Sequence, residues 1–187
     1  MAAGADADAD SAAAAADPAR EGVPSPQMLR AALGRFATGV TIITCRDTAG
    51  DPVGLTVNSF APLSLEPPLV LWSLRRASPS LAAFEAASHF AVNVLAETQV
   101  ELSRRFAAPR PEASGEFGKF DQGSWSGGLG GVPVLAGCAA VFECECSVVH
   151  DGGDHRLFIG RVLRLADLAT APLLFQGGRY HLLGEVL

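Results

Sequence analysis

Segments with β-strand character dominate this sequence, and helices do not follow them at regular intervals. Runs of β-branched and aromatic residues bounded by Gly, Pro or Asp predict strands. These runs lie at residues 40–45, 53–59, 69–74, 90–95, 139–149 and 156–165, with a last short hairpin at 173–183. A doubly wound parallel sheet needs a helix after nearly every strand. We therefore expect a mainly β fold, a closed antiparallel barrel with added helices.

The sequence divides into a tail and one domain. Residues 1–24 consist mostly of Ala, Asp, Gly and Pro without an amphipathic stripe, so we expect a disordered tail. Ser25 can cap a helix that has Pro26 at its first position, and Gly39 ends it. Two further helices are predicted at residues 80–87 and 97–106, and residues 107–131 are irregular. Residues 25–187 are thus expected to form a single domain.

The composition argues against several classes of function. Of the 187 residues, 49% are hydrophobic and 18% are charged, and the net charge is −6. No basic block is longer than the pairs Arg75 with Arg76 and Arg104 with Arg105, so nucleic acid is not an expected partner. Apolar runs end well before the roughly 20 residues that a membrane helix needs, and no secretory signal is visible. We expect a cytoplasmic protein.

The four cysteines suggest buried thiols rather than disulfides. Cys144 and Cys146 alternate within a predicted strand and would share one face of it. A domain of this size does not need disulfides to be stable. Zinc is the alternative, but a C-x-C pair without a second pair matches zinc ligands poorly, so we expect no metal.

Several familiar catalytic and nucleotide-binding motifs are absent from the sequence. There is no G-x-G-x-x-G after a strand, no phosphate-binding loop with Lys-Ser or Lys-Thr, no G-x-S-x-G and no H-E-x-x-H. The glycine-rich run at residues 127–131 is followed by Val-Pro and is interpreted as a connection. Classical nucleotide folds, serine hydrolases and zinc proteases are therefore not supported.

Polar side chains gather where the second predicted strand ends. Thr56, Asn58 and Ser59 offer hydroxyl and amide groups, which suit a bound phosphate or the edge of a heteroaromatic ring. The alternative is an edge strand that ends in a turn capped by its own side chains.

The third predicted strand ends in a second polar group, which contains Ser73, Arg75, Arg76 and Ser78. Guanidinium and hydroxyl donors together are a common way to hold a phosphate. If the second and third strands pair, both polar groups lie at one end of one sheet. Taken alone, the two arginines are typical of a solvated turn.

Two further features stand near the polar groups only if the fold brings them there. Residues 106–110 and 119–121 suggest a lid that carries Lys119 toward an anion and Phe106 or Phe120 toward a ring. The alternative is a mobile loop with apolar anchors. His155 opens a strand directly after a tight turn and could hydrogen-bond a substrate in either charge state, although a single histidine is more often structural.

Together these features resemble the flavin reductase domain family, the FMN-binding split barrel that serves as the reductase of two-component monooxygenases. The resemblance extends from about Leu29 to Leu183. The matching motifs lie, in this order, at residues 36–41, 54–60, 64–68, 90–95, 119–120 and 153–155. Each motif is short, and their common order makes the resemblance specific.

The resemblance implies a flavin site and a hydride donor. The residues expected to contact the flavin ring and its ribityl chain are Thr56, Val57, Asn58 and Ser59. Those expected near the phosphate are Ser73, Arg76 and Ser78, and those expected to close over the cofactor are Phe106, Ala107 and Lys119. His155 would border the nicotinamide pocket. The acidic, Pro-rich segment before Lys119 departs from the family pattern and leaves the reach of this lysine open.

The implied reaction is hydride transfer from NADH or NADPH to FMN or FAD, with the reduced flavin passed to a partner monooxygenase. Such proteins are homodimers with the flavin near the subunit interface. Because the cofactor supplies the chemistry, the chain needs no acid, base or nucleophile. The alternatives are a flavin-dependent oxidoreductase that acts on a corrinoid or a quinone, and a non-catalytic flavin- or haem-binding module. Arg75, Arg104 and Arg161 are the candidates for choosing between NADH and NADPH.

Overall fold

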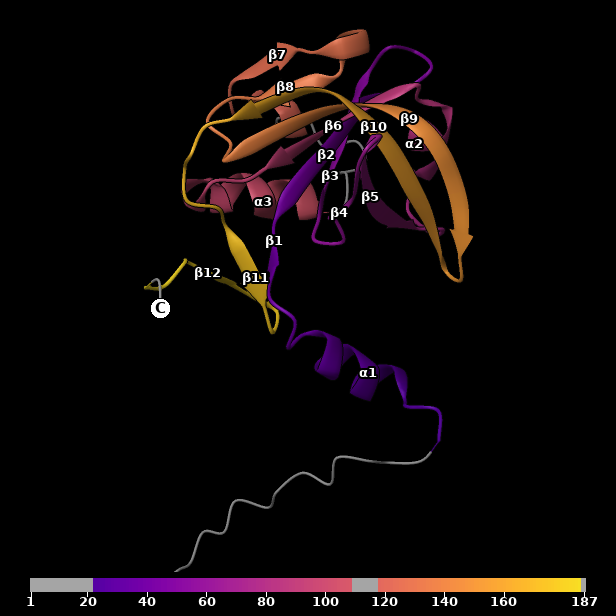
Figure 1. Cartoon of the computed structure of the whole chain (residues 1–187), viewed down its shortest axis with the longest axis vertical. Coiled ribbons are helices and arrows are strands. Elements are labelled where there is room, and N and C mark those ends of the chain that lie inside the picture. The colour runs from indigo at the N-terminus through magenta and orange to yellow at the C-terminus, as the bar shows by residue number, and fades with distance from the viewer. Residues whose placement is uncertain (1–21, 109–117, 186–187) are drawn as a thin grey trace, which may run out of the picture.

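The computed structural model describes residues 22–108 and 118–185 (Figure 1). The strands are β1 (Thr38–Gly39), β2 (Thr41–Arg46), β3 (Pro52–Val57), β4 (Ala61–Leu65), β5 (Pro68–Arg75), β6 (His89–Val94), β7 (Trp125–Gly127), β8 (Pro133–Leu135), β9 (Ala140–Gly152), β10 (His155–Asp167), β11 (Leu174–Gln176) and β12 (Arg179–His181). The α-helices are α1 (Pro26–Leu33), α2 (Leu81–Ala86) and α3 (Val100–Ala107). Short 3-10 turns are η1 (Glu97–Gln99), η2 (Lys119–Asp121) and η3 (Leu129–Gly131).

The predicted elements are present nearly where the sequence placed them. Helix α1 begins as expected, because the Ser25 side chain accepts a hydrogen bond from the Met28 backbone N–H at 3.2 Å. The expected end at Gly39 is wrong, because the helix ends at Leu33 with Gly34 as its cap and Gly39 lies in β1. The long hairpin of β9 and β10 turns at Gly153 and Asp154. Strand β4 was not predicted, because Pro62 within it and the two prolines that follow it obscure the pattern of a strand. Pro62 lies in an edge strand, where a missing N–H is tolerated.

Seven antiparallel strands form one sheet in the order β3-β2-β6-β9-β10-β5-β4. The expectation of a closed barrel is wrong for the described residues, because strand pairing ends at β3 on one edge and at β4 on the other. After β3 the chain passes through residues 58–60 into β4, and β4 pairs with β5 instead of β3. The fold is therefore mainly antiparallel β with few helices, and its sheet remains open.

The second and third predicted strands, which correspond to β3 and β5, do not pair. Each lies at or next to an opposite edge of the sheet. Their ends nevertheless meet, because the Ser59 hydroxyl donates to the Ser73 carbonyl and accepts from the Ser73 N–H, both at 3.0 Å. The expected neighbourhood of the two polar groups thus arises from the curvature of the sheet, bridged by one side chain.

Two apolar clusters lie on opposite faces of the sheet. Strand β2 is buried on both faces, and alternate residues such as Ile43 and Ile42 enter different clusters. The first cluster contains Trp72, which stacks on Phe158 with ring centroids 4.5 Å apart. The second contains Phe106 of α3, the helix that packs against β3. Core packing on both faces fixes β3, the strand that forms one wall of the candidate site.

The cysteines are free thiols within the core or at its border. Burial raises the pKa of Cys45, Cys138 and Cys144 to about 12, and it also raises the pKa of Cys146. Thiols with such a raised pKa carry almost no thiolate at neutral pH and are poor nucleophiles. Among the helices of residues 22–108 and 118–185, none has the length and apolar character that a membrane crossing requires.

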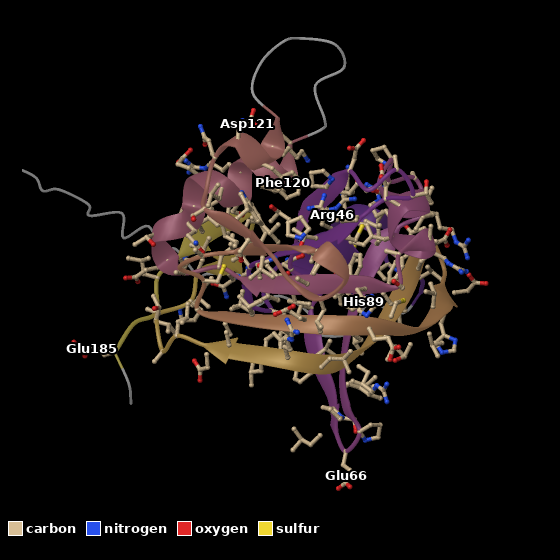
Figure 2. All side chains as sticks on the ribbon, turned by 90° about the horizontal axis from the view of Figure 1, so that it is seen from above. Arg46, Glu66, His89, Phe120, Asp121 and Glu185 are labelled. Atoms are coloured by element: carbon tan, nitrogen blue, oxygen red, sulfur yellow. The ribbon has the colours of Figure 1, made fainter. Side chains whose placement is uncertain are left out.

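Two elements project from the rest of the domain. Figure 1 shows α1 extending away from the sheet, and this helix has no buried residue. Figure 2 shows Glu66 at the tip of the β4–β5 hairpin, which also extends outward. Both carry exposed apolar side chains, with Phe36 77% exposed just after α1 and Leu65 95% exposed in β4.

Candidate functional site

A cavity of about 460 Å³ opens where β3 and β5 end. Its walls come from three parts of the chain, namely residues 55–59, residues 73–78 without Arg76, and the start of β10. The predicted site residues that line it are Thr56, Val57, Asn58, Ser59, Ser73, Ser78 and His155. The structure thus brings together residues that lie far apart along the chain and that we predicted to contact the flavin ring, the phosphate and the nicotinamide.

The hydroxyls of Thr56 and Ser59, on the β3 side, hold the cavity wall in place. The Thr56 hydroxyl donates to the Ser103 backbone carbonyl of α3 at 2.7 Å. The Ser59 hydroxyl makes the two bonds to Ser73 that join β3 to β5. Because these hydroxyls are already engaged, they fix the wall more than they offer donors to a ligand.

Other polar groups at the cavity keep their hydrogen-bonding capacity. In the described part of the chain, no hydrogen bond involves the side-chain amide of Asn58, the Ser73 hydroxyl or the Arg75 guanidinium. All three residues line the cavity. The Ser78 hydroxyl accepts from the Ser80 N–H at 3.3 Å and still has a proton to donate. These groups make one side of the cavity suitable for a phosphate and for the edge of a polar ring.

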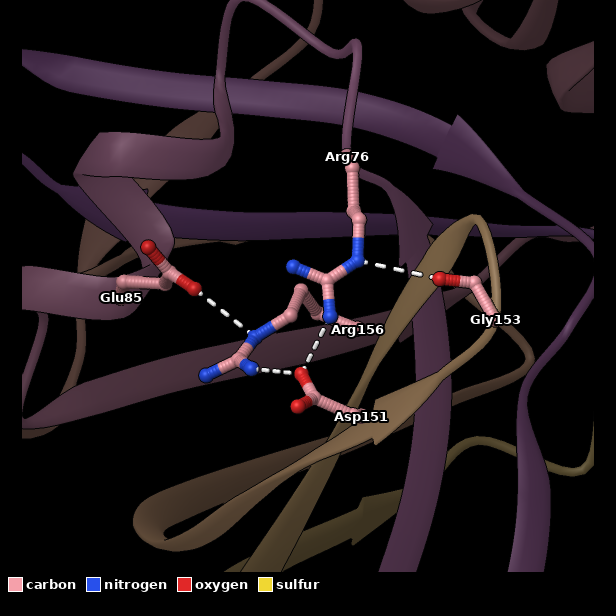
Figure 3. Close-up of polar contacts among 5 residues, drawn as sticks. All are labelled: Arg76, Glu85, Asp151, Gly153 and Arg156. Atoms are coloured by element: carbon pink, nitrogen blue, oxygen red, sulfur yellow. Dashed lines mark hydrogen bonds and ion pairs between the residues drawn. The ribbon is translucent and has the colours of Figure 1, made fainter.

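Arg75 rather than Arg76 is the arginine of the cavity. Arg75 is the last residue of β5, two positions after Ser73, so the two side chains share a face of the sheet. Arg76 is directed elsewhere, as Figure 3 shows, where its Nε donates to the Gly153 carbonyl at 3.0 Å and its guanidinium pairs with Asp151. Arg76, which we expected near the phosphate, therefore does not line the cavity, and the alternation of side chains along a strand is the signal that could have pointed to Arg75.

The predicted lid residues lie outside the cavity lining. The Phe106 side chain is buried, with its ring centroid 5.1 Å from that of Phe120 and 5.4 Å from that of Trp125. Lys119 donates from Nζ to the Phe106 carbonyl at 3.1 Å, and Ala107 is exposed at the end of α3. The Phe106 ring leaves no room for a side chain at Gly54, where a Cβ would lie 2.8 Å from it. These residues support β3 from its far face, and residues 109–110 of the expected lid fall outside the described part.

His155 occupies the start of β10, opposite Arg75 in the neighbouring strand. Its Nδ1 lies 2.7 Å from a carboxylate oxygen of Asp154, and its side chain is 35% exposed. The hydrogen bond to His155 is the main reason that the pKa of Asp154 is lowered. An Nδ1–H donated to this carboxylate leaves Nε2 as the nitrogen available to a ligand.

A second cavity, also of about 460 Å³, lies at the other end of β3. Arg46 lines it and is already bound to the carbonyls of Gly131 and Gly50, each at 2.6 Å. His89, labelled with Arg46 in Figure 2, has its Nδ1 2.9 Å from the Ser88 hydroxyl. The partners of these groups are protein atoms, so the first cavity is the better candidate for a ligand site.

The first cavity fits a flavin in size and in chemistry. Pockets for cofactors commonly measure about 300–1,000 Å³ and combine apolar walls with a few polar groups. Leu55, Val57 and Leu74 provide apolar surface beside the polar groups described above. Donors for a phosphate stand on the β5 side and an amide for a ring edge on the β3 side.

The comparisons with known proteins agree with this assignment. Residues 33–184 match the model of the flavin reductase like domain. The chain is 45% identical over 159 residues to FMN reductase (NADH) SmoA of Agrobacterium fabrum, a match that covers 85% of this chain and 87% of the relative. It is 46% identical over 156 residues to the flavin-dependent monooxygenase reductase subunit HsaB of Rhodococcus jostii, covering 83% and 76%.

A solved structure has the same fold. The NADH:FAD oxidoreductase SgcE6 of Streptomyces globisporus superposes with a TM-score of 0.80 at 35% identity, covering 90% of this chain and 99% of that chain. Some relatives are longer, and the chain spans 48% of one from Rhizobium meliloti to which it is 40% identical. The matched region contains every described residue of the cavity. This chain belongs to the flavin reductase like domain family.

Proposed function

We propose that this chain is an NAD(P)H-dependent flavin reductase that reduces FMN or FAD and supplies the reduced flavin to a partner monooxygenase. The observation that carries the proposal is the cavity in which Asn58, Ser73, Arg75, Ser78 and His155 come together from three parts of the chain. The names of the relatives support the same chemistry, because they include an FMN reductase that uses NADH and a monooxygenase reductase subunit.

A bound flavin supplies an acceptor for a hydride, and the chain positions the two reactants. Asn58 hydrogen-bonds the polar edge of the ring from the β3 side of the cavity. Ser73, Arg75 and Ser78 hold the phosphate from the β5 side, where a guanidinium and hydroxyls are suited to phosphate oxygens. Thr56 and Ser59 keep the wall rigid through their bonds to Ser103 and Ser73.

His155 borders the position of the nicotinamide. Asp154 accepts from Nδ1 and so orients the imidazole with Nε2 toward a ligand group. This arrangement contributes by binding and orienting the hydride donor, since holding two reactants in the right geometry can lower a barrier substantially. No group of the cavity has to act as a nucleophile.

Phe106, Lys119 and Arg76 act behind the cavity walls in this proposal. Phe106 packs under Gly54 of β3, Lys119 holds the end of α3 through the Phe106 carbonyl, and Arg76 fixes the turn before His155. Ala107 is exposed at the end of α3 and lies outside the cavity lining.

A homodimer is the proposed assembly. Exposed apolar residues on α1 and on the β4–β5 hairpin lack a partner within the described part of the chain; they are Met28, Leu29, Leu33, Leu63 and Leu65. Contiguous exposed apolar surface often marks a protein interface, and most soluble oligomers are symmetric dimers. The free, buried thiols suit a reducing compartment, and we propose the cytoplasm.

The test is the consumption of NADH or NADPH by the purified protein with FMN or FAD, each combination measured separately by nucleotide absorbance. Oxidation of a nucleotide that depends on both protein and flavin is the expected result. No oxidation in any of the combinations would contradict the proposed reaction. Turnover that appears only when a quinone or a corrinoid is added would instead identify a different acceptor.

A further inference from the structure

Five residues on the outer side of the candidate site form one polar network (Figure 3). Asp151 accepts from both Arg76 and Arg156 through the same carboxylate oxygen. Arg156 reaches back to α2, where its Nε lies 2.9 Å from a carboxylate oxygen of Glu85. Arg76 also donates to the Gly153 carbonyl at 3.0 Å. The network therefore connects α2, the turn after β5 and the β9–β10 turn.

The turn that the network holds is the one that presents His155. Gly153 and Asp154 form its tip, directly after Gly152, the last residue of β9, and Gly153 has φ +67°, a conformation that favours glycine. The Arg76 backbone N–H also donates to the Asp154 carbonyl at 2.9 Å. Because the consecutive residues Gly152 and Gly153 restrict the backbone little, the position of this turn depends on contacts with its neighbours, and Asp151 supplies the charged ones.

The network and the cavity lie on different sides of the same strand. His155 lines the cavity, whereas the next residue, Arg156, points to the other face and joins the network. The Arg156 side chain is 23% exposed, which makes it the most enclosed member of its ion pairs. None of Glu85, Asp151 or Arg156 lines the cavity, so their effect on a ligand has to pass through the turn.

We propose that Asp151 is a positioning residue for the nicotinamide nucleotide: bound to Arg76 and Arg156, it holds the β9–β10 turn so that His155 faces the cavity. This inference rests on the proposed reductase function. It assigns a role in binding the hydride donor to Asp151, Arg156 and Glu85, although none of them lines the cavity. Asn58 directly follows β3 and Ser73 lies in β5, so their contacts with flavin do not depend on the position of the β9–β10 turn.

The test is Asp151→Ala, with steady-state kinetics for NADH at saturating flavin and a separate flavin titration. Asp151 is exposed, so loss of its two ion pairs should lower kcat/KM for NADH by about fivefold, an effect of the size that exposed ion pairs have. Flavin affinity should stay the same. Asp151→Asn keeps a side-chain oxygen and should retain part of the NADH efficiency.

A double variant separates positioning from general weakening. If Asp151 acts through His155, Asp151→Ala should cause no further loss of NADH efficiency in a His155→Ala background. The matched control is Arg164→Ala, which removes the 3.8 Å pair with Glu143 from the same hairpin at a place outside the cavity lining. This control should leave NADH kinetics unchanged.

A spectroscopic readout distinguishes failure of this inference from failure of the proposed function. The chain has four histidines, and His155→Ala identifies the ring signals of His155 in an NMR spectrum. Asp151→Ala should shift those signals, and Arg164→Ala should not, whether or not the protein turns over NADH. Unchanged His155 signals, or equal losses caused by Asp151→Ala with and without His155, would overturn the positioning role. An inactive wild-type protein would contradict only the reductase proposal.

Discussion

At the scale of single residues, the cavity lining contains two kinds of polar group: those whose hydrogen-bonding capacity is open to a ligand, and those that hold the wall in place. Thr56 and Ser59 have their hydroxyls bound to backbone atoms, whereas Asn58 lines the cavity without such a bond. A hydroxyl that already donates to a carbonyl contributes to rigidity, and an amide with open capacity contributes to recognition. Substitutions at these neighbouring positions should therefore have different consequences.

Asn58→Ala should weaken flavin binding without destabilising the fold. Loss of one or two hydrogen bonds corresponds to about 1–2 kcal/mol, or roughly a tenfold rise in the dissociation constant. A flavin titration followed by fluorescence measures this change. His155→Ala is the comparison, since it should mainly raise the KM for the nicotinamide nucleotide. Equal and negligible effects of both variants would contradict the two roles.

Arg75→Ala and Arg76→Ala should differ in their effect on the flavin phosphate. Arg75 lines the cavity, so its removal should lower the affinity for FMN by about fivefold. The affinity for riboflavin, which has no phosphate, should stay nearly unchanged. Arg76 is bound to Asp151 and Gly153, so its removal should not discriminate between the two flavins. Titration of both variants with both flavins measures the difference, and a phosphate-specific loss in Arg76→Ala alone would reverse our assignment.

Most of the cavity residues were accessible from the sequence, and the exceptions have a physical reason. The polar residues at 56–59 and 73–78 could be recognised in the sequence by their residue types. The choice between Arg75 and Arg76 depended on which face of β5 each side chain occupies, and the alternation from Ser73 indicates Arg75. That Thr56 and Ser59 are engaged by distant backbone atoms could not be predicted, because it depends on how α3 and β5 approach β3.

At the scale of elements, α3 and the η2 turn support β3 from the face opposite to the cavity. Phe106, Phe120 and Trp125 make an aromatic group beneath Gly54, with Phe120 and Trp125 ring centroids 4.9 Å apart. The sequence suggested a lid in this region. Aromatic residues near a glycine-rich loop fit either a lid or a core, and only the packing decides.

Phe106→Ala should lower the free energy of unfolding by about 3–5 kcal/mol, because it leaves a cavity in a buried cluster. Urea denaturation measures this loss. Phe106→Leu, which keeps most of the volume, should cost clearly less. If Phe106→Ala left stability unchanged and abolished flavin binding, Phe106 would be a ligand contact and not a core residue.

The Asp151 network should make stability depend on pH in the acid range. The hydrogen bond from Arg156 is the largest cause, and the charge of Arg76 the next, of the lowered pKa of Asp151. A carboxyl group whose pKa is lower in the folded state than in the unfolded state stabilises the fold. For Asp151 this stabilisation is fully present at pH values above the ordinary carboxyl pKa of 3.8, and it is lost as the pH falls through the lower pKa of the folded state.

Asp151→Asn should therefore lower the melting temperature at neutral pH. The difference from wild type should shrink as the pH falls below 3.8. Thermal unfolding at several pH values, followed by circular dichroism, measures both effects. A difference that stays constant from neutral to acid pH would show that the charge of Asp151 is not responsible.

The order of the elements along the chain could largely be predicted from the sequence. Whether the strands close into a barrel could not. Strand patterns, the capped helix α1 and the β9–β10 turn follow from local signals in the sequence. Whether β3 pairs with β4 and closes the sheet depends on the path of residues 58–60 and on β4, which its Pro62 made hard to recognise as a strand. An open sheet with converging edges is therefore a tertiary property.

At the scale of the whole molecule, the projecting elements account for exposed apolar surface that one chain does not cover. Leu65 is 95% exposed at the β4–β5 hairpin, and α1 buries none of its residues. A second copy of the chain would cover such surface in a symmetric dimer.

Leu65→Asp should shift the protein from dimer to monomer without unfolding it, because a charge at an apolar interface is costly and Leu65 makes no core contact. Light scattering coupled to size exclusion measures the mass. Glu66→Gln, at the tip of the same hairpin, should leave the mass unchanged. A wild-type protein that is monomeric at all concentrations would contradict the proposed assembly.

The most direct measurement is an absorbance titration of the purified protein with flavin, followed by NADH without oxygen. The account predicts that the flavin spectrum changes on binding and that its visible band bleaches once NADH is added, with both effects reduced in Asn58→Ala. A protein that leaves the flavin spectrum unchanged, or that binds flavin whose band NADH does not bleach, would contradict a flavin reductase built on this cavity.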